Sequence, residues 1–395
     1  MLKAIKGGLI INGKGGHPIP NGLILVEDNR IHSVGPCESL PIPRDAEVID
    51  LGSATLLPGL IDTHVHLVMN MEEDCVTSLA HKSAVESVVE AAQNARRALL
   101  GGVTTVRDCA DVFGVTLTLK QAIDAGNLDG PRILACGLPI TTTAGHLNYM
   151  GISADSTEEV LKAVRTVVNM GVDWVKVMAT GGGLTPASNV RRAQYSAETL
   201  TALVQDAHRL GRKVAAHAHG TEGILNCAIA GTDSIEHCSW MAEEEGLRYD
   251  ENAIDLIRKK GLYVSHTIAG PRTGSPEEVK EILNSELGER FALLRRTLEE
   301  GVPMVISSDA GIPGCRFEDF AGSLVIAVKC CGFSPMGAII ASTSRAAKML
   351  GMEDQIGSLE AGRFADIIAV DGNPLQTIDS IRQIISVFKS GKQIV

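Results

Sequence analysis

The hydrophobic pattern of the chain changes once, near residue 56. Before that point, short apolar runs such as "GLII" and "GLILVE" are separated by turn signals that include Asn12-Gly13 and Asn21-Gly22. Short apolar runs bounded by glycine and asparagine are typical of antiparallel strands. We therefore predict a small β unit at the N-terminal end of the chain.

From residue 56 onward, apolar strand-like runs alternate with longer amphipathic stretches such as "TEEVLKAVRTVVNMG" and "SAETLTALVQDAHRLG". This alternation predicts a parallel sheet covered by helices. The candidate strands are residues 61–67, 103–108, 132–136, 174–179, 213–217, 233–237, 262–266 and 303–309. Eight such repeats favour an α/β fold of the (β/α)8 TIM barrel type over a doubly wound sheet, which usually has fewer strands and a glycine-rich phosphate turn.

Short apolar runs typical of strands return after residue 356, in "GRFADIIAVDG" and "ISVFKSGKQIV". Chain termini often lie close together, so we expect these strands to join the N-terminal ones. The predicted domains are a small β-sandwich domain built from residues 1–55 and 357–395, and a barrel at residues 56–356.

Composition narrows the classes of function. No apolar run reaches the ~18 residues that a membrane span needs, and the net charge of −11 with only 3% aromatic residues argues against nucleic acid. Nine scattered cysteines without CxxC spacing, and no recognisable export signal, predict a cytoplasmic protein. The expected partner is a small-molecule substrate, and the oligomeric state, a homo-oligomer included, is left open.

Polar residues gather where the predicted barrel strands end, which is where the loops of a TIM barrel form a common mouth. His64 and His66 are two residues apart on a strand, so their side chains point to the same face and can reach one metal ion. The alternative is a pair of core histidines bonded to backbone carbonyls. The other strand ends favour the metal site, because they carry Asp108, Lys176, His217, His219, His237, His266 and Asp309.

Lys176 lies in the apolar stretch "DWVKVMATGGG", where a buried ammonium is costly unless something compensates it. One explanation is a salt bridge to Asp108 or Asp309. The other is that nearby cations depress the pKa of the lysine and that the neutral amine adds CO2. The resulting carbamate is an anionic ligand that can bridge two metal ions.

Two further strand ends suit a second ion. His217 and His237 end consecutive strands, and Asp309 ends the eighth strand, which lies beside the first in a closed barrel and therefore faces His64 and His66. Four imidazoles, a carbamate and a carboxylate suit a pair of borderline divalent ions, with Zn2+ expected first and manganese, cobalt or nickel as alternatives.

The motifs "PGLIDTHVH", "VKVMATGG", "AAHAHG", "IEHC", "SSDAG" and "GSLEAGRFADIIAVDGNP" together resemble the amidohydrolase superfamily along essentially the whole chain. Within it, the chain most resembles the binuclear branch that contains imidodipeptidases (Xaa-Pro dipeptidases) and related carboxypeptidases. The resemblance implies that His64, His66 and Asp309 bind one metal and that His217 and His237 bind the other. It also implies that carboxylated Lys176 and a hydroxide bridge the two ions.

Two departures refine the resemblance. Mononuclear deaminases of this superfamily usually place a glutamate shortly after the fifth-strand histidine, and Glu222 in "HAHGTEG" fits that spacing poorly. Hydrolysis is therefore favoured over deamination. Dipeptidase relatives usually have a tyrosine where this chain has His219, so no specific dipeptide is implied.

We predict hydrolysis of a C–N amide bond of a dipeptide or N-acyl amino acid-like substrate by a metal-bridging hydroxide, with Asp309 as the general base. Arg191 and Arg192 could clamp a substrate carboxylate. Alternatives are the hydrolysis of a carbamate, urea, cyclic amide or lactone, and a non-catalytic metal-binding scaffold, which is disfavoured because every ligand position is filled. The candidate substrate contacts are His146, His219, Tyr195, His266 and Arg192.

Overall fold

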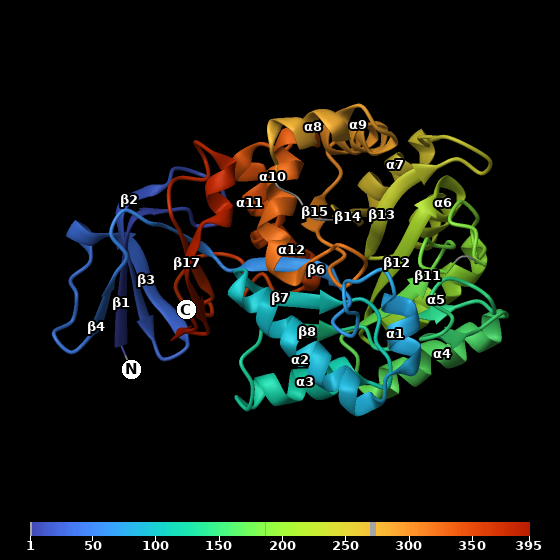
Figure 1. The fold of residues 1–395 in the computed structure, drawn as a ribbon, viewed down its shortest axis with the longest axis horizontal. Coiled ribbons are helices and arrows are strands. Elements are labelled where there is room, and N and C mark those ends of the chain that lie inside the picture. The colour runs from blue at the N-terminus through green and yellow to red at the C-terminus, as the bar shows by residue number, and fades with distance from the viewer. Residues whose placement is uncertain (1, 186, 269–273) are drawn as a thin grey trace.

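The computed structural model describes residues 2–185, 187–268 and 274–395. Figure 1 shows a β-sheet at one side of the molecule, blue and red, and a larger region of strands and helices beside it. The blue and red colours show that this sheet combines strands from both ends of the chain. We call it the terminal sheet.

The terminal sheet has the strand order β18-β17-β16-β5-β1-β2-β3, with β4 paired to β1. Its strands are β1 (Leu2–Ile10), β2 (Ile19–Glu27), β3 (Arg30–Pro36), β4 (Glu47–Asp50), β5 (Thr55–Pro58), β16 (Ile367–Val370), β17 (Ile384–Lys389) and β18 (Lys392–Gln393). β16 pairs antiparallel with β5, which confirms that strands from the two ends of the chain join.

The first strand begins earlier than the sequence pattern indicates, at Leu2 instead of near Gly8. Lys3 and Lys6 interrupt the apolar pattern, but their ammonium groups find partners at the edge of the strand. Lys3 Nζ donates to the Gly391 carbonyl oxygen at 2.7 Å, and Lys6 Nζ pairs with Asp50 at 2.6 Å. A charged residue whose head group is satisfied in this way does not end a strand.

The larger region contains a strand for each of the eight that the sequence predicts. They are β6 (Leu60–Val65), β7 (Val103–Asp108), β8 (Arg132–Ala135), β11 (Trp174–Met178), β12 (Lys213–Gly220), β13 (Ser234–Met241), β14 (Tyr263–Thr267) and β15 (Met304–Ser307). The pairs β6-β7-β8 and β11-β12-β13-β14-β15 are parallel. Backbone hydrogen bonds also join the end of β15 to β6, from Asp309 N to the His64 oxygen and from His66 N to the Ala310 oxygen. The architecture is α/β and of the TIM-barrel type.

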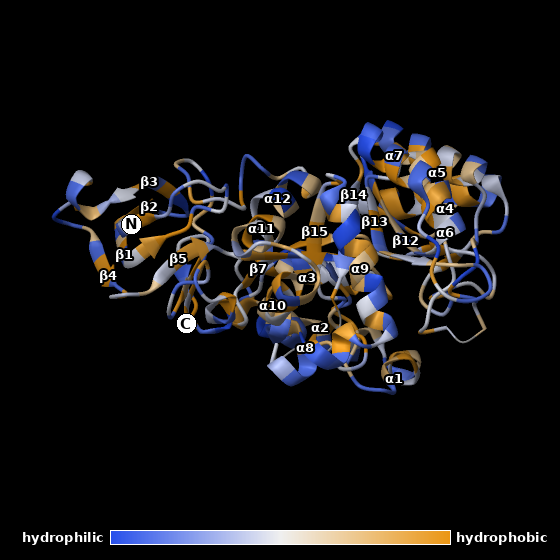
Figure 2. Ribbon diagram, turned by 90° about the horizontal axis from the view of Figure 1, so that it is seen from above, coloured by the Kyte–Doolittle hydropathy of each residue, from blue (hydrophilic) through white to orange (hydrophobic). Residues whose placement is uncertain are grey.

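Helices alternate with these strands and pack their apolar faces against them. They are α1 (Cys75–His81), α2 (Ala84–Leu100), α3 (Val115–Asp124), α4 (Thr157–Met170), α5 (Ala197–Arg209), α6 (Thr221–Ala230), α7 (Glu251–Lys260), α8 (Pro276–Leu283), α9 (Glu286–Glu299), α10 (Phe320–Cys330), α11 (Pro335–Ala341) and α12 (Ser344–Leu350). The short strands β9 (Ile140–Thr141) and β10 (Ile152–Ser153) precede α4. In Figure 2 the strands are largely hydrophobic and the helices carry one hydrophobic and one hydrophilic side.

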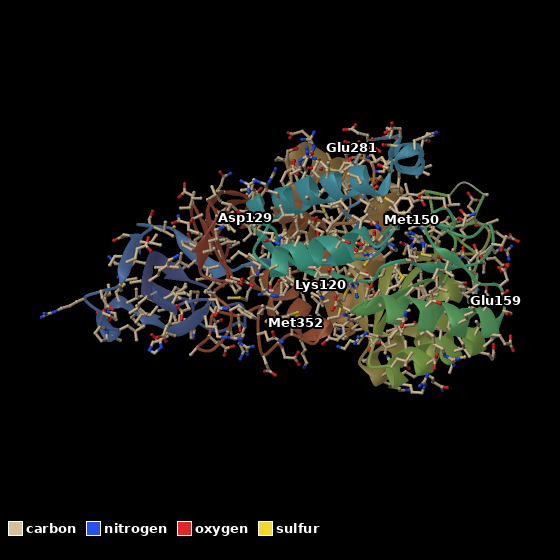
Figure 3. All side chains as sticks on the ribbon, turned by 90° about the horizontal axis from the view of Figure 1, so that it is seen from below. Lys120, Asp129, Met150, Glu159, Glu281 and Met352 are labelled. Carbon is tan, nitrogen blue, oxygen red and sulfur yellow. The ribbon has the colours of Figure 1, made fainter. Side chains whose placement is uncertain are left out.

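Helix α4 shows why these segments are helical. Ser156 and Glu159 form a capping box at its start, and Gly171 ends it in the left-handed conformation at a φ of 93°. Val160, Val164 and Val167 fall on one face at helical spacing and are buried. Charged residues occupy the other face, and Figure 3 shows Glu159 and, on α8, Glu281 at the edge of the molecule.

Two findings bear on the class of protein. Within the described ranges, no helix is both long enough and apolar enough to cross a membrane. Free thiols are found at Cys37, Cys75, Cys109, Cys136, Cys227 and Cys238.

Candidate metal centre

A cavity of about 270 Å³ opens where the carboxyl ends of the parallel strands meet. Its polar lining residues are His64, His66, His146, Lys176, His217, His219, His237, Thr267, Arg290 and Asp309. Its apolar lining comes chiefly from Leu147, Met178, Leu184, Leu287, Phe291 and Ile312. The fold therefore brings all six residues that the sequence suggests as metal ligands to one cavity.

His64, His66 and Asp309 form one group in this cavity. Asp309 Oδ1 lies 3.5 Å from His64 Nε2 and 3.2 Å from His66 Nε2, and the potential ligand atoms lie within 4.8 Å of one another. Burial alone would raise the pKa of Asp309, but the positive charges of His64, His66 and Lys176 hold it well below its usual range. The carboxylate is therefore ionised, as a metal ligand must be.

Asp309 also has an unusual backbone conformation, with a φ of 61°. His237 has a φ of 67°. Residues other than glycine rarely adopt this left-handed region, and such strain tends to occur at functional sites. Both side chains line the cavity, His237 from within β13 and Asp309 from the second residue after β15.

His217 and His237 form a second group, together with His219. His217 Nδ1 faces His237 Nε2 at 2.9 Å, while His217 Nε2 lies 3.0 Å from the Gly181 carbonyl oxygen. Since a carbonyl can only accept, Nε2 carries the proton and Nδ1 is left with its lone pair. Burial and the neighbouring imidazoles hold the pKa values of His217 and His237 well below normal, so both rings are neutral, the form that binds metals.

Lys176 is 1% exposed, and its Nζ makes no hydrogen bond or ion pair with any residue that the structure describes. The predicted alternative of a salt bridge to Asp108 or Asp309 is thus not formed. Asp108 Oδ2 instead accepts a hydrogen bond from the Leu67 amide at 2.8 Å. A buried ammonium without a partner is costly, whereas a carbamate at this atom would face the imidazoles as an anion. The donor set therefore fits two divalent cations.

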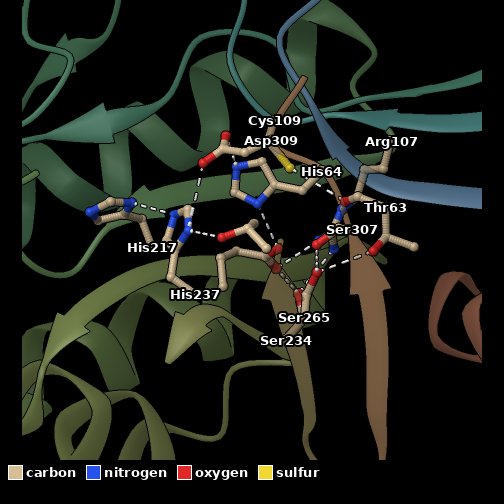
Figure 4. A network of polar contacts seen from close by, with 12 residues as sticks. Thr63, His64, Arg107, Cys109, His217, Ser234, His237, Ser265, Ser307 and Asp309 are labelled. Atoms are coloured by element: carbon tan, nitrogen blue, oxygen red, sulfur yellow. Dashed lines mark hydrogen bonds and ion pairs between the residues drawn. The ribbon is translucent and has the colours of Figure 1, made fainter. Parts of the chain in front are cut away.

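A buried network of Glu236 and Arg107, neither of which is among the predicted site residues, fixes the orientation of His64. Glu236 Oε2 lies 2.9 Å from His64 Nδ1, and Arg107 Nη2 donates to Glu236 Oε1 at 2.6 Å. Burial would raise the pKa of Glu236, but Arg107 and His64 hold it well below normal. Figure 4 shows this network, with His64 and Arg107 on neighbouring strands and Asp309 above His64. A carboxylate on Nδ1 leaves Nε2 of His64 free to bind a metal.

Two of the predicted substrate contacts line the cavity, namely His146 and His219. The His146 ring stands 4.4 Å from that of His217, and the His219 ring stacks on that of His237 at 4.4 Å. Burial lowers the pKa of each ring to about 3, with Lys176 adding to the effect at His146 and Arg290 at His219. Both rings are therefore neutral near pH 7 and can each donate one hydrogen bond.

The other three predicted contacts lie outside the described lining of the cavity. The Tyr195 hydroxyl donates to the Ala154 oxygen at 2.8 Å, and Arg192 forms an ion pair with Glu243 at the surface. His266 is buried, with Nδ1 3.2 Å from the His237 oxygen. The polar atoms of these three side chains thus bond within the chain, from the long segment after β11 for Tyr195 and Arg192 and from β14 for His266.

Arg290 lines the cavity, although the sequence analysis did not predict it. It lies on α9, three residues after Leu287 and next to Phe291, and both of these line the cavity as well. Residues three apart share one face of a helix. The signal that could have found Arg290 is therefore a cation on the apolar face of an otherwise ordinary amphipathic helix.

Comparisons with known proteins agree with this geometry. Residues 55–394 match the model of the amidohydrolase family. Ochratoxinase of Aspergillus niger is 30% identical over 98% of this chain and 85% of its own. The structure of a Xaa-Pro dipeptidase with bound methionine has a TM-score of 0.85 at 30% identity and covers 100% of this chain and 99% of its own. A putative prolidase from Bifidobacterium longum has a TM-score of 0.82 at 29% identity and covers 100% and 94%.

Proposed function

Because the chain belongs to the amidohydrolase family, we propose that it is a binuclear metal hydrolase that cleaves the C–N amide bond of a dipeptide or N-acyl amino acid-like substrate. The relatives named Xaa-Pro dipeptidase and prolidase support a peptide-like substrate. A cavity of about 270 Å³ suits a molecule of that size.

The observation that carries the proposal is the state of Lys176. Its Nζ is buried without a described partner in a cavity ringed by His64, His66, His217, His237 and Asp309. A buried ammonium without an ion-pair partner is unfavourable in this cavity, but an anionic carbamate between two cations is not.

In this proposal His64, His66 and Asp309 would hold one ion, His217 and His237 would hold the other, and a carboxylated Lys176 would supply an anionic ligand to both. Zn2+ is the expected metal because imidazole and carboxylate ligands suit it. When bound, the ions supply Lewis acidity, which lowers the pKa of a water and polarises the scissile carbonyl.

Asp309 provides the proton transfer. Its carboxylate is kept ionised by the cations around it, so an Oδ atom can accept a proton from the attacking water and pass it to the leaving nitrogen. His146 and His219 are neutral donors in the same cavity and can bind substrate oxygens.

We further propose that the barrel is closed and that the two chain ends form a separate domain. The eight parallel strands would form a closed barrel spanning residues 56–356, because the ends of β6 and β15 are joined by hydrogen bonds. The terminal sheet would fold as a β-sandwich domain of residues 1–55 and 357–395.

The test is an assay of zinc-reconstituted protein against Xaa-Pro and other dipeptides, N-acyl amino acids and aryl carbamates, with metal content measured in parallel. We expect two ions per chain and cleavage of the peptide-like amides. Preferential cleavage of the carbamates would support the alternative of a carbamate or urea hydrolase. Full metal content with no turnover on any of these substrates would support a non-catalytic scaffold.

A further inference from the structure

Arg290 places a positively charged guanidinium at the wall of the cavity. Its Nη2 donates to Ser239 Oγ at 2.6 Å, while its Nε is enclosed and makes no hydrogen bond with any described residue. In the ranges that the structure covers, Arg290 forms no ion pair, although the Glu286 carboxylate on the preceding turn of α9 attracts it. A guanidinium has five N–H donors, and among the described residues only Ser239 Oγ accepts a hydrogen bond from Arg290.

The position of Arg290 relative to the proposed metal ligands follows from a short chain of contacts. Ser239 Oγ accepts a hydrogen bond from Arg290 and also lies within hydrogen-bond distance of His219 Nδ1, at 2.8 Å. The His219 ring in turn stacks on that of His237 at 4.4 Å. The guanidinium thus lies two hydrogen bonds from a ring that is stacked on a proposed metal ligand.

The surroundings of Arg290 also indicate what kind of molecule it faces. Leu287 and Phe291 lie on the same face of α9, and Leu147 and Leu184 add apolar surface to the cavity. A cation in an apolar wall is suited to a small molecule that carries one carboxylate next to an apolar side chain.

We propose that Arg290 is the specificity-determining residue of this cavity and binds the α-carboxylate of an amino acid with an apolar side chain. The inference rests on the proposed function and deepens it. In an N-acyl amino acid or dipeptide, the carboxylate carbon is two bonds beyond the scissile nitrogen. Nη1 and the unused hydrogen of Nη2 offer the planar fork that matches its two oxygens. Leu287 and Phe291 then contact the apolar side chain.

The experiment compares carboxylates with their neutral carboxamides. Zinc-loaded protein is assayed with N-acetyl-L-leucine against N-acetyl-L-leucinamide, and with glycyl-L-leucine against glycyl-L-leucinamide. The parent should prefer the carboxylate in each pair. Arg290→Met should reduce the ratio of kcat/KM values about 30-fold, mainly through KM, since a charge-assisted bond of ~2 kcal/mol is lost. Arg290→Lys keeps the charge but loses the planar pair of N–H donors, so its ratio should lie between that of the parent and that of Arg290→Met.

Arg296→Gln is the matched control, because Arg296 is on the same helix and pairs at the surface with Glu251 and Glu300. It removes the same charge and should leave the ratio within about twofold. If Arg290 only braces Ser239 and His219, Arg290→Met will slow carboxylate and carboxamide equally and leave the ratio unchanged, which overturns the inference.

A binding measurement separates this inference from the proposed function. Calorimetric titration of zinc-loaded protein with L-leucine and L-leucinamide requires no turnover. Binding of L-leucine that Arg290→Met weakens about 30-fold supports the inference even if no amide is cleaved, in which case the proposed function fails. Cleavage of amides without preference for the carboxylate leaves the proposed function standing and overturns the inference. A failure of L-leucine to bind at millimolar concentration, together with no cleavage of either carboxylate, also overturns the inference.

Discussion

At the start of the barrel strands, the Asp366 carboxylate accepts hydrogen bonds from Arg132 Nη1 at 2.7 Å and from the Ser390 amide at 2.8 Å, and Lys389 Nζ lies 3.5 Å away. At the opposite ends of the strands, Lys176 and Arg290 keep donors that have no partner among the described residues. Both regions bury charge, but the cluster at Asp366 pairs its charges within the chain, whereas Lys176 and Arg290 form no ion pair with any described residue.

This difference distinguishes buried charges that stabilise the fold from buried charges that we propose bind a ligand. Arg132, Asp366 and Lys389 connect β8 to the terminal sheet, and Arg132 also stands 4.5 Å from the centre of the Phe364 ring. Their interactions are complete within the chain, so they need nothing else. In our proposal the charges of Lys176 and Arg290 are compensated when a ligand binds, so the fold holds these two charges in the cavity at a cost in stability.

The largest effect is expected at Lys176. Lys176→Met keeps the apolar stem and removes the amine, so no carbamate can form and at least one ion per chain should be lost, with turnover falling to background. Metal content by mass spectrometry and the peptide assay measure both. Lys213→Met is the control, since Lys213 Nζ donates to the Met349 oxygen at the start of β12. Full metal content and turnover in Lys176→Met would remove the basis of the proposed site.

The second effect is expected at Asp309. Asp309→Asn keeps the shape of the side chain and one ligand oxygen but cannot accept the proton, so kcat should fall about 10³-fold. Metal content should change less than in Lys176→Met. An unchanged kcat would assign the proton transfer to another group.

The third prediction concerns the support of His64. Glu236→Gln weakens the hydrogen bond to His64 Nδ1 and leaves Arg107 without its carboxylate, so zinc affinity should fall about 10- to 100-fold. Competition with a chelator measures this without using activity. Glu222→Gln, an exposed glutamate in the first turn of α6, should leave the affinity unchanged. Equal affinities in both variants would show that Glu236 does not support the metal ligand.

Parts of this comparison could be predicted from sequence and parts could not. The two-residue period of strands and the convergence of strand ends locate His64, His66 and Asp309 by local rules. Glu236 could not be predicted, because a strand that directs His237 into the cavity is expected to direct its neighbour to the opposite face. Both serve the site, since the left-handed backbone at His237 breaks the alternation that would direct neighbouring side chains to opposite faces. Arg290 depends on how α9 packs over the mouth, which is a tertiary property that no local pattern carries.

The smallest effect on catalysis is expected where charge is already paired. Asp366→Asn leaves Arg132 and Lys389 without their carboxylate, so the free energy of unfolding should fall by about 3 kcal/mol while kcat/KM stays unchanged. Urea unfolding measures the loss, and Asp371→Asn, at an exposed position just after β16, should have little effect.

The dependence of this loss on pH tests its cause. Burial would raise the pKa of Asp366, but Lys389 and Arg132 hold it below the ordinary value of 3.8. A carboxyl group whose pKa is lowered by folding stabilises the protein fully above its unfolded pKa and loses that contribution as the pH falls through the folded pKa. The difference in unfolding free energy between parent and Asp366→Asn should therefore be constant above about pH 5 and shrink progressively below about pH 4. A difference that stays constant down to the acid limit of folding would mean that the amide disrupts packing, and the contrast between paired and unpaired charge would then have to rest on the cavity alone.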